Sequence, residues 1–238
     1  GEFVDLKLPA GKGTAKRAII MLKRAAAIKK FVKENDICTA YSFTHAPNEA
    51  LALSGAKCVK YISCRDYVRL IKSSKLYSFA LRHGCNVLFN ALEMQKKCEE
   101  MFPGNEDKLF TAYNIIDCEK AREDAKEELD EEYEEYKEFY DTHRVIAFSS
   151  RFVDQKCQWD MLKSFELLKK DIPDAGLIFL GCRGEYENAV REMAKKSEYS
   201  GDIVFAGFQK NVFKFVSRAD VFAMTSYYEG FPNVIVEA

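Results

Sequence analysis

Short apolar segments alternate with segments of helical periodicity along most of the chain, and this alternation constrains the fold more than any other feature. The apolar runs fall at residues 3–8, 37–43, 58–63, 86–90 and 108–114, and again at 144–150, 176–181, 203–208 and 220–226. Helical patterns cover residues 14–33, 47–53, 73–82, 91–102, 157–170, 185–197 and 211–217, and a last helix starts near Pro232. Strands separated by helices are typical of parallel β-α-β units. The sequence therefore predicts an α/β fold with two Rossmann-like domains.

Residues 119–141 interrupt this pattern and suggest where the two domains meet. The segment holds twelve acidic and four basic residues. It is either an acidic interaction tail or a solvated helix that packs Leu129, Tyr133, Tyr136 and Tyr140 onto a neighbour, and we favour the helix, bridging two domains. The predicted domains are 1–113, an acidic helical linker at 114–142, and 143–238. We expect both ends of the chain to be cut and the second domain to be incomplete at the C-terminus, because the chain starts at Gly1 and ends within a helical pattern.

Composition excludes several classes of protein. With 36 basic and 37 acidic residues the net charge is −1, which argues against a nucleic-acid-binding protein that relies on a basic face. The eight cysteines form no C-x-x-C pair and have no histidine at metal-ligand spacing, so we predict reduced thiols and no metal site. No apolar run approaches the ~20 residues of a membrane span. We expect a cytoplasmic protein, able to work at the cytoplasmic face of a membrane.

Two carboxylates near the C-terminus suit a polyhydroxylated ligand. Glu229 follows the run at 220–226, and Glu237 stands eight residues later, within the last predicted helix. Each carboxylate can accept hydrogen bonds from two neighbouring hydroxyls. The backbone amides of Gly230, Phe231 and Asn233 would lie at the mouth of that helix, where anions bind. The alternative is two surface glutamates at a helix start, where acidic residues are favoured in any case.

Basic residues follow the first strand predicted in the second half. Arg151 and Lys156 both stand beyond the carboxyl end of that strand, where ligands bind in open α/β sheets. A diphosphate needs such fixed cations, and a leaving diphosphate needs them more as its charge develops. The alternative is a pair of solvated bases in a loop. The glycines of GCRGE at 181–185 allow either a close approach to a ligand or a plain tight turn.

Taken in order, these segments resemble the family 4 glycosyltransferases of the GT-B fold. The resemblance runs from about Asn114 to Ala238 through YNIID, RFVDQK, LGCRGE, VFAGF and ADVFAMTSYYEGFPNVIVE. It implies that Arg151 and Lys156 bind a donor diphosphate, that Glu229 meets the sugar, and that Glu237 holds the ribose hydroxyls. The catalytic residues it implies are Glu229, Arg151 and Lys156. The donor-binding set it implies is Arg151, Lys156, Gly181, Gly207, Phe208, Glu229, Gly230, Phe231, Pro232, Asn233 and Glu237.

The chain departs from the family pattern at some positions. It starts after the position of the family's first strand, so the resemblance implies that the first domain lacks that strand. Ile115 replaces the proline that usually follows the asparagine, and a histidine often found at the end of a strand in the first half is not evident. YISCRD at 61–66 resembles a segment of the polysaccharide-building members, which makes Arg65 an acceptor-side candidate. His45 follows a strand and is a second acceptor-side candidate, although a structural role explains a lone histidine more simply.

The resemblance implies a glycosyltransferase that moves a hexose-type sugar from a nucleotide sugar to a glycan or a lipid-linked acceptor, with retention of configuration. It implies no obligatory cofactor or metal; a UDP-sugar is the first choice of donor, ahead of GDP- and ADP-sugars. Peripheral membrane association would fit such an acceptor. Two alternatives stay open: a nucleotide-sugar epimerase or hydrolase of the same fold, and a non-catalytic protein that binds nucleotide sugars.

Overall fold

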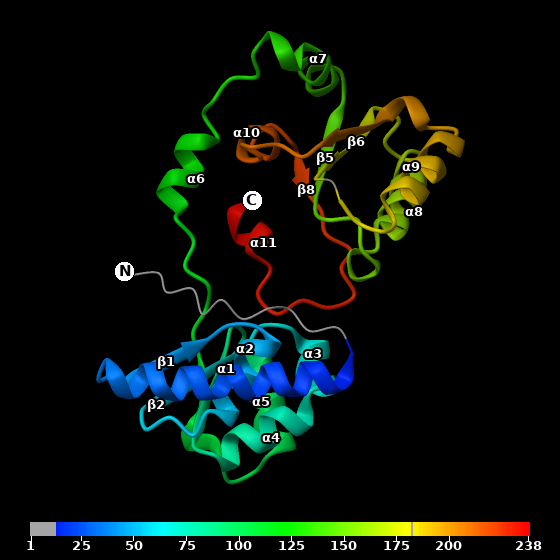
Figure 1. Cartoon of the computed structure of the whole chain (residues 1–238). Coiled ribbons are helices and arrows are strands. Elements are labelled where there is room, and N and C mark those ends of the chain that lie inside the picture. Colours follow the sequence, from blue (N-terminus) through cyan, green and yellow to red (C-terminus); the bar gives the residue numbers. More distant parts are fainter. Residues whose placement is uncertain (1–12, 182) are drawn as a thin grey trace. The chain divides into compact units, whose positions relative to one another are not determined.

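The structure, a computed structural model, describes residues 13–181 and 183–238. The chain divides into two compact units, Gly1–Asn114 and Ile115–Ala238 (Figure 1). Each unit contains a four-stranded parallel sheet with helices, which confirms the predicted class of two Rossmann-like α/β domains. The strand predicted at residues 3–8 lies outside the described residues.

The first unit has a sheet in which spatial order follows chain order, β1-β2-β3-β4. Its buried core joins strand residues such as Ile62 and Val87 to Tyr77 and Met94 of the covering helices. The elements are α1 (Thr14–Glu34), β1 (Thr39–Ser42), α2 (His45–Leu53), β2 (Val59–Cys64), α3 (Tyr67–Lys72), α4 (Ser74–Arg82), β3 (Cys85–Phe89), α5 (Leu92–Met101), η1 (Glu106–Lys108) and β4 (Leu109–Thr111).

The sequence patterns anticipated every strand and helix of this unit within the described residues except α3 and η1. Helix α3 is six residues long, which is too short to show helical periodicity. A local signal for it exists nonetheless. The Asp66 side chain accepts a hydrogen bond from the Arg69 amide at 2.8 Å, which is an N-cap.

The second unit has the sheet order β7-β6-β5-β8, so the strand order reverses at β5. Phenylalanines such as Phe148, Phe165 and Phe179 fill one side of its core, and Phe139 and Phe215 fill the other. The elements are α6 (Cys118–Asp124), η2 (Glu131–Tyr133), α7 (Glu134–Thr142), β5 (Arg144–Ser149), η3 (Asp154–Lys156), α8 (Gln158–Leu168), β6 (Ala175–Leu180), α9 (Glu187–Lys196), η4 (Ser200–Asp202), β7 (Ile203–Gly207), α10 (Phe213–Val216), β8 (Val221–Phe222) and α11 (Asn233–Glu237).

The acidic segment forms two helices, α6 and α7, and not the single helix that we predicted. Like charges three and four residues apart disfavour a helix through residues 125–130. The last carbonyls of α6 find partners elsewhere: Asn211 Nδ2 donates to Asp124 O at 2.7 Å, and Ser217 Oγ donates to Ala125 O at 3.1 Å. Leu129 lies in the non-helical stretch between the two helices, and its side chain is buried. Both helices lie in the second unit.

Strand β8 is shorter than the predicted run at 220–226. It pairs with β5 only through Val221 and Phe222, and the Ala223 amide adds one hydrogen bond to Ala147 O at 2.9 Å. Beyond Ala223 the chain leaves the sheet, because its polar groups bond to the loop that follows β5. This early departure shapes the candidate site.

Candidate functional site

The reversal of strand order between β5 and β8 marks the place where a ligand is expected. In open α/β sheets, the loops after two strands that diverge from such a switch point leave a crevice at their carboxyl ends. Here those loops are residues 150–157 after β5 and residues 223–232 after β8. The predicted Arg151 and Lys156 lie in the first loop, and Glu229 lies in the second.

The loop after β5 is fixed by buried contacts. Phe152 is fully buried in the core beside Phe179. Gln158, also fully buried, donates from Nε2 to Ser150 Oγ at 3.0 Å and to Arg151 O at 2.6 Å. These contacts hold the backbone on both sides of Arg151 in one conformation.

A glycine turn after β6 packs directly on that loop. A side chain at Gly181 would place its Cβ 2.3 Å from Ser150 O, and one at Gly184 would place it 1.9 Å from Phe152 O. Gly181 also has φ +122°, a backbone conformation that other residues rarely adopt. The glycines therefore allow close contact between two loops of the protein.

The loop after β8 is tied to the loop after β5 by hydrogen bonds. The Thr225 hydroxyl lies 3.1 Å from Lys156 O and 2.9 Å from Cys157 O. Gln155 adds two further bonds, since its Nε2 donates to Tyr228 O at 2.7 Å and its carbonyl accepts from the Tyr227 amide at 2.9 Å. Sequence analysis did not identify Thr225, Gln155 or Gln158. The feature that could have identified them is a polar side chain in, or just after, a loop that follows a strand.

These bonds bring Lys156 and Glu229 together across 73 residues of sequence. Lys156 Nζ donates to Glu229 Oε1 at 2.5 Å, and the side chains are 16% and 19% exposed. An ammonium carries three donors, and among the described residues Glu229 is the one hydrogen-bond partner of Lys156 Nζ. The pair is thus largely shielded from water and retains donor capacity for an oxyanion.

Arg151 and Pro232 lie in the same two loops as the pair, whereas Gly207 ends β7 and Phe208 follows it. The Arg151 side chain is exposed, and within the described residues it makes no hydrogen bond or ion pair. Gly207, with φ +68°, accepts from the Gly181 amide at 2.7 Å, and Phe208 is 74% exposed. Pro232 caps the five-residue helix α11, whose first residue is Asn233.

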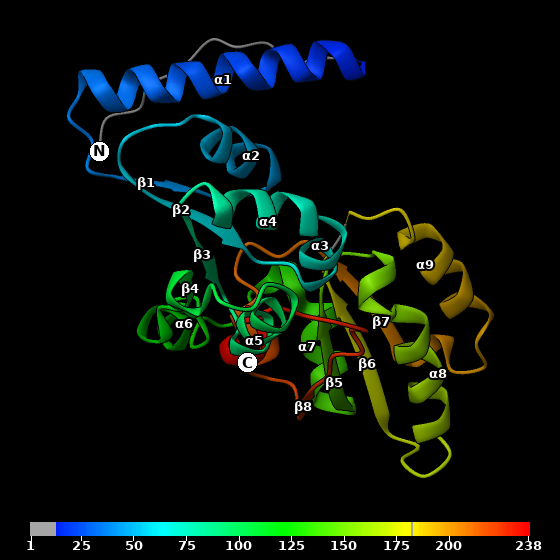
Figure 2. The ribbon, with the colours of Figure 1, turned by 90° about the horizontal axis from the view of Figure 1, so that it is seen from below.

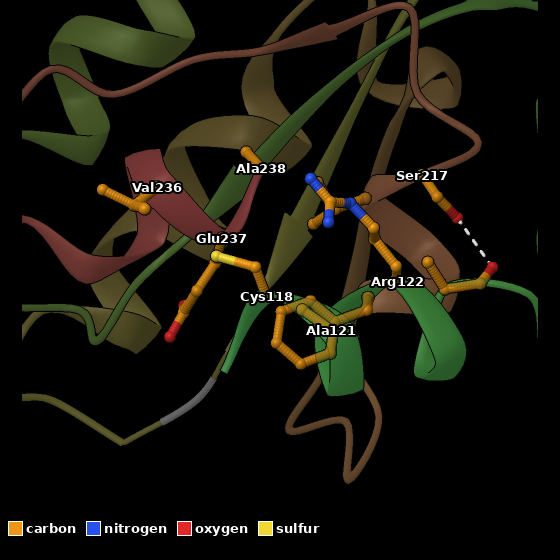
Figure 3. Close-up of a pocket in the computed structure, with 10 residues that line it drawn as sticks. Cys118, Ala121, Arg122, Ser217, Val236, Glu237 and Ala238 are labelled. Atoms are coloured by element: carbon orange, nitrogen blue, oxygen red, sulfur yellow. Dashed lines mark hydrogen bonds between the residues drawn. The ribbon is translucent and has the colours of Figure 1, made fainter. Parts of the chain in front are cut away.

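Glu237 lies in α11 and lines a separate cavity of about 260 Å³ (Figure 3). Cys118, Ala121 and Arg122 of α6 line the other side of that cavity. Burial raises the pKa of the Glu237 carboxyl. Glu237 shares this cavity with residues of α6 and α10. None of the other predicted donor residues lines this cavity within the described part of the chain.

The two acceptor-side candidates lie in the first unit. Arg65 follows β2, and its Nη2 donates to Asn114 Oδ1 at 2.6 Å. Both residues line a small cavity of about 30 Å³ at the carboxyl ends of the strands, together with the buried Asn90, whose Oδ1 has no hydrogen-bond partner within the described residues. His45 begins α2, and its Nδ1 lies 3.4 Å from the Ser73 hydroxyl.

Across residues 13–181 and 183–238, no three His, Cys, Asp or Glu side chains gather in a way that could hold a metal ion. Within the same residues, no helix is long and apolar enough to cross a membrane.

Comparison with solved structures places the fold among the glycosyltransferases. The chain superposes on HepE of Anabaena, solved in complex with UDP and glucose, with a TM-score of 0.73 and 17% identity over 90% of this chain and 59% of that one. A glycosyltransferase of Rickettsia africae gives a TM-score of 0.73 at 18% identity, covering 95% of this chain and 62% of that one.

The sequence of the second unit also matches a glycosyltransferase family model. Residues 130–238 match the family model described as "Glycosyl transferases group 1". An uncharacterized glycosyltransferase of Methanocaldococcus jannaschii is 28% identical over 162 residues, which are 68% of this chain and 39% of the relative. An N-acetylgalactosaminyltransferase of Campylobacter jejuni that acts on a diphospho-undecaprenol glycan is 24% identical over 60% of this chain and 32% of its own length. The chain therefore spans well under half the length of these two relatives.

Proposed function

We propose that the second unit binds the donor of a glycosyltransferase that moves a hexose-type sugar from a UDP-sugar to a glycan or lipid-linked acceptor. The observation that carries this proposal is the Lys156–Glu229 pair at the reversal of strand order between β5 and β8. A cation and a carboxylate side by side match the phosphate and hydroxyl groups that a nucleotide sugar presents together.

Lys156 has the donor capacity that a diphosphate requires. The ammonium can bond a phosphate oxygen while it stays bonded to Glu229, because it has three donors. Arg151, exposed in the same loop, supplies a second cation and a bidentate fork. As the sugar–phosphate bond breaks, negative charge grows on the leaving diphosphate, and two fixed cations stabilise it more than they stabilise the ground state. We propose that they do this without a metal ion or other cofactor.

Glu229 is proposed to orient the sugar. Its carboxylate accepts hydrogen bonds from sugar hydroxyls beside the diphosphate, which lets the acceptor hydroxyl attack from the face that the diphosphate leaves. Attack from that face retains the configuration at the anomeric carbon. The backbone of Gly230, Phe231, Pro232 and Asn233 borders this position, and we assign Gly181, Gly207 and Phe208 to the same donor side. Glu237 is proposed to hold the ribose hydroxyls, which requires α11 to turn toward the Lys156–Glu229 pair.

The comparisons support the substrate classes in this proposal. The HepE structure holds UDP and glucose, and the C. jejuni relative is named for a lipid-linked acceptor. By analogy we propose a role in polysaccharide biosynthesis in the cytoplasm or at the cytoplasmic face of a membrane, with Arg65 and His45 on the acceptor side. UDP-, GDP- and ADP-sugars are the donors to compare.

The test is the substitution Lys156→Ala. We expect UDP-sugar affinity to fall at least about tenfold, because a charge-assisted hydrogen bond is worth roughly 1.5–3 kcal/mol. Sugar transfer should fall further, since the leaving diphosphate depends on the same cation. Isothermal titration with UDP-sugar and radiolabelled sugar transfer measure the two effects. The matched control is Lys170→Ala, which removes an exposed lysine beyond α8 and should leave both unchanged.

Unchanged transfer by folded Lys156→Ala protein would contradict the proposal. Incubation with UDP-sugar and no acceptor separates it from the alternatives. Rapid epimerised product or free sugar would favour an epimerase or hydrolase, and binding without any turnover on a panel of glycan and lipid-linked acceptors would favour a non-catalytic binding protein.

A further inference from the structure

Helix α1 concentrates positive charge in a chain that is otherwise acidic. Its 21 residues hold seven Lys or Arg and one acidic residue, Glu34, whereas the net charge of the whole chain is −1. At 1.5 Å per residue the helix is about 30 Å long. The basic residues are therefore clustered on α1, although the net charge of the whole chain is close to zero.

The two faces of α1 differ in what they contact. Ala25 and Val32 are buried, and Ile28 packs against the core of the first unit. Figure 2 shows α1 lying along α2 at the edge of this unit. On the opposite face Ile19 and Leu22 are 55% and 62% exposed. Residues three apart on a helix are neighbours, so these two form one exposed apolar stripe.

Exposed lysines flank this stripe. Helical geometry places Lys23 on one side of it and Lys33 in line with it about three to four turns further on. At the end of the helix a cavity of about 610 Å³ is lined by Lys29, Lys33 and Lys57, so the basic surface continues past α1. One acidic residue, Asp36, lines the same cavity.

Apolar side chains among lysines on a packed surface helix match a membrane interface. Leucine and isoleucine side chains gain free energy on entering the acyl boundary, while lysines bind anionic headgroups and extend their apolar stems along the surface. A polyanion in water would use the lysines alone. We propose that the outer face of α1 binds a membrane surface rich in anionic lipid, with the helix axis in the plane of the membrane. This inference does not depend on the proposed glycosyltransferase activity.

Vesicle co-sedimentation tests the proposal. The whole chain should sediment with phosphatidylcholine vesicles that contain phosphatidylglycerol and stay in solution with pure phosphatidylcholine. Binding should weaken as ionic strength rises, because headgroup attraction is screened beyond a Debye length of about 8 Å at physiological salt.

Two double variants separate the charged from the apolar contribution. Lys23→Gln with Lys33→Gln should weaken binding on the order of 30-fold, given the attraction of each base near an anionic surface. Ile19→Gln with Leu22→Gln keeps the charge and a good helix former, and should also weaken binding at least tenfold. Lys195→Gln with Lys196→Gln removes the same charge from α9 and should have no effect. Circular dichroism and thermal unfolding show whether each variant is folded.

The outcomes decide the proposal. Absence of binding to phosphatidylglycerol vesicles at low salt would overturn it, and so would equal losses in the α9 control. If the lysine variant loses binding while folded Ile19→Gln, Leu22→Gln protein keeps it, the face is a general polyanion-binding surface and the membrane proposal is wrong. Loss in both α1 variants with an unaffected α9 control supports it.

Discussion

At the scale of single residues, the second unit depends on a buried lysine outside the candidate site. Lys169 is 6% exposed, and its ammonium has three partners: Pro173 O, Ala175 O at 3.0 Å and Asp202 Oδ2 at 2.7 Å. All three donors of the ammonium are therefore used. The second oxygen of Asp202 lies 3.1 Å from His143 Nε2. These bonds join the ends of α7 and α8 to η4 before β7.

Asp202 should make the stability of the second unit dependent on pH. Burial acts to raise the pKa of its carboxyl, but the hydrogen bonds from Lys169 and His143 prevail and hold that pKa below its usual value. A carboxyl whose pKa is lower when folded stabilises the protein above its unfolded pKa, about 3.9, and this contribution is lost as pH falls through the folded pKa. Asp202→Asn should thus cost about 2 kcal/mol at pH 7, since a hydrogen bond to a charged group is worth roughly 1.5–3 kcal/mol and Lys169 loses its carboxylate partner.

The cost of Asp202→Asn should shrink as pH falls from about 4 through the folded pKa, because the wild-type carboxyl becomes protonated first in the unfolded state and then in the folded state. Urea unfolding at a series of pH values measures it. Asp171→Asn is the control, because Asp171 is exposed and precedes the same β6 region. A penalty for Asp202→Asn that stays constant from neutral to acid pH would contradict this account.

At the scale of elements, the turn between β6 and α9 supports the loop that carries Arg151 and Lys156. The Tyr186 amide donates to Phe152 O at 3.2 Å, which draws the turn against that loop. Gly184 stands inside this contact, so its lack of a side chain sets how closely the two loops approach. The position of Lys156 thus depends on an element that never touches it.

We predict that Gly184→Ala weakens UDP binding more than it weakens the fold. The new Cβ would lie 1.9 Å from Phe152 O, so the loop must shift, and Lys156 would move relative to Glu229. Shifts of about 1 Å near a site can cost two orders of magnitude in turnover. Gly201→Ala is the matched control, because nothing lies within 4 Å of its added Cβ. Titration with UDP and thermal unfolding measure both effects; equal UDP affinity in the two variants would show that the turn does not position Lys156.

The elements also show how far sequence alone could go. The strands of both sheets follow from apolar runs such as 144–150 and 176–181, because parallel strands are buried on both faces. The break in the acidic segment and the early end of β8 did not follow, since they depend on bonds from Asn211 and Thr225 to distant backbone. The places of Lys156 and Glu229 in loops after two strands of the second unit were predictable from the strand pattern. Their direct contact was not, because it requires knowing that β8 lies beside β5.

At the scale of the whole molecule, the two units divide the proposed tasks. Each has its own buried core, the first around Ile62, Leu81 and Phe89 and the second on both faces of the β5–β8 sheet. The Lys156–Glu229 pair and all other proposed donor residues belong to the second unit, whereas Arg65, His45 and the basic face of α1 belong to the first. Because separate cores open separately, a ligand that binds one unit should stabilise mainly that unit.

UDP should therefore slow amide hydrogen exchange in the second unit and leave the first largely unchanged. At a UDP concentration one hundred times the dissociation constant, binding stabilises the second unit against unfolding by about 2.7 kcal/mol. Amides that exchange only when the whole unit unfolds should therefore exchange up to roughly 100-fold more slowly. The strongest local protection should fall in residues 150–157 and 223–232, since these loops carry Lys156 and Glu229. Mass spectrometry of peptic fragments measures this, and Lys156→Ala protein should lose the protection at equal UDP. Protection confined to the first unit would place the nucleotide there and contradict the assignment of the donor site.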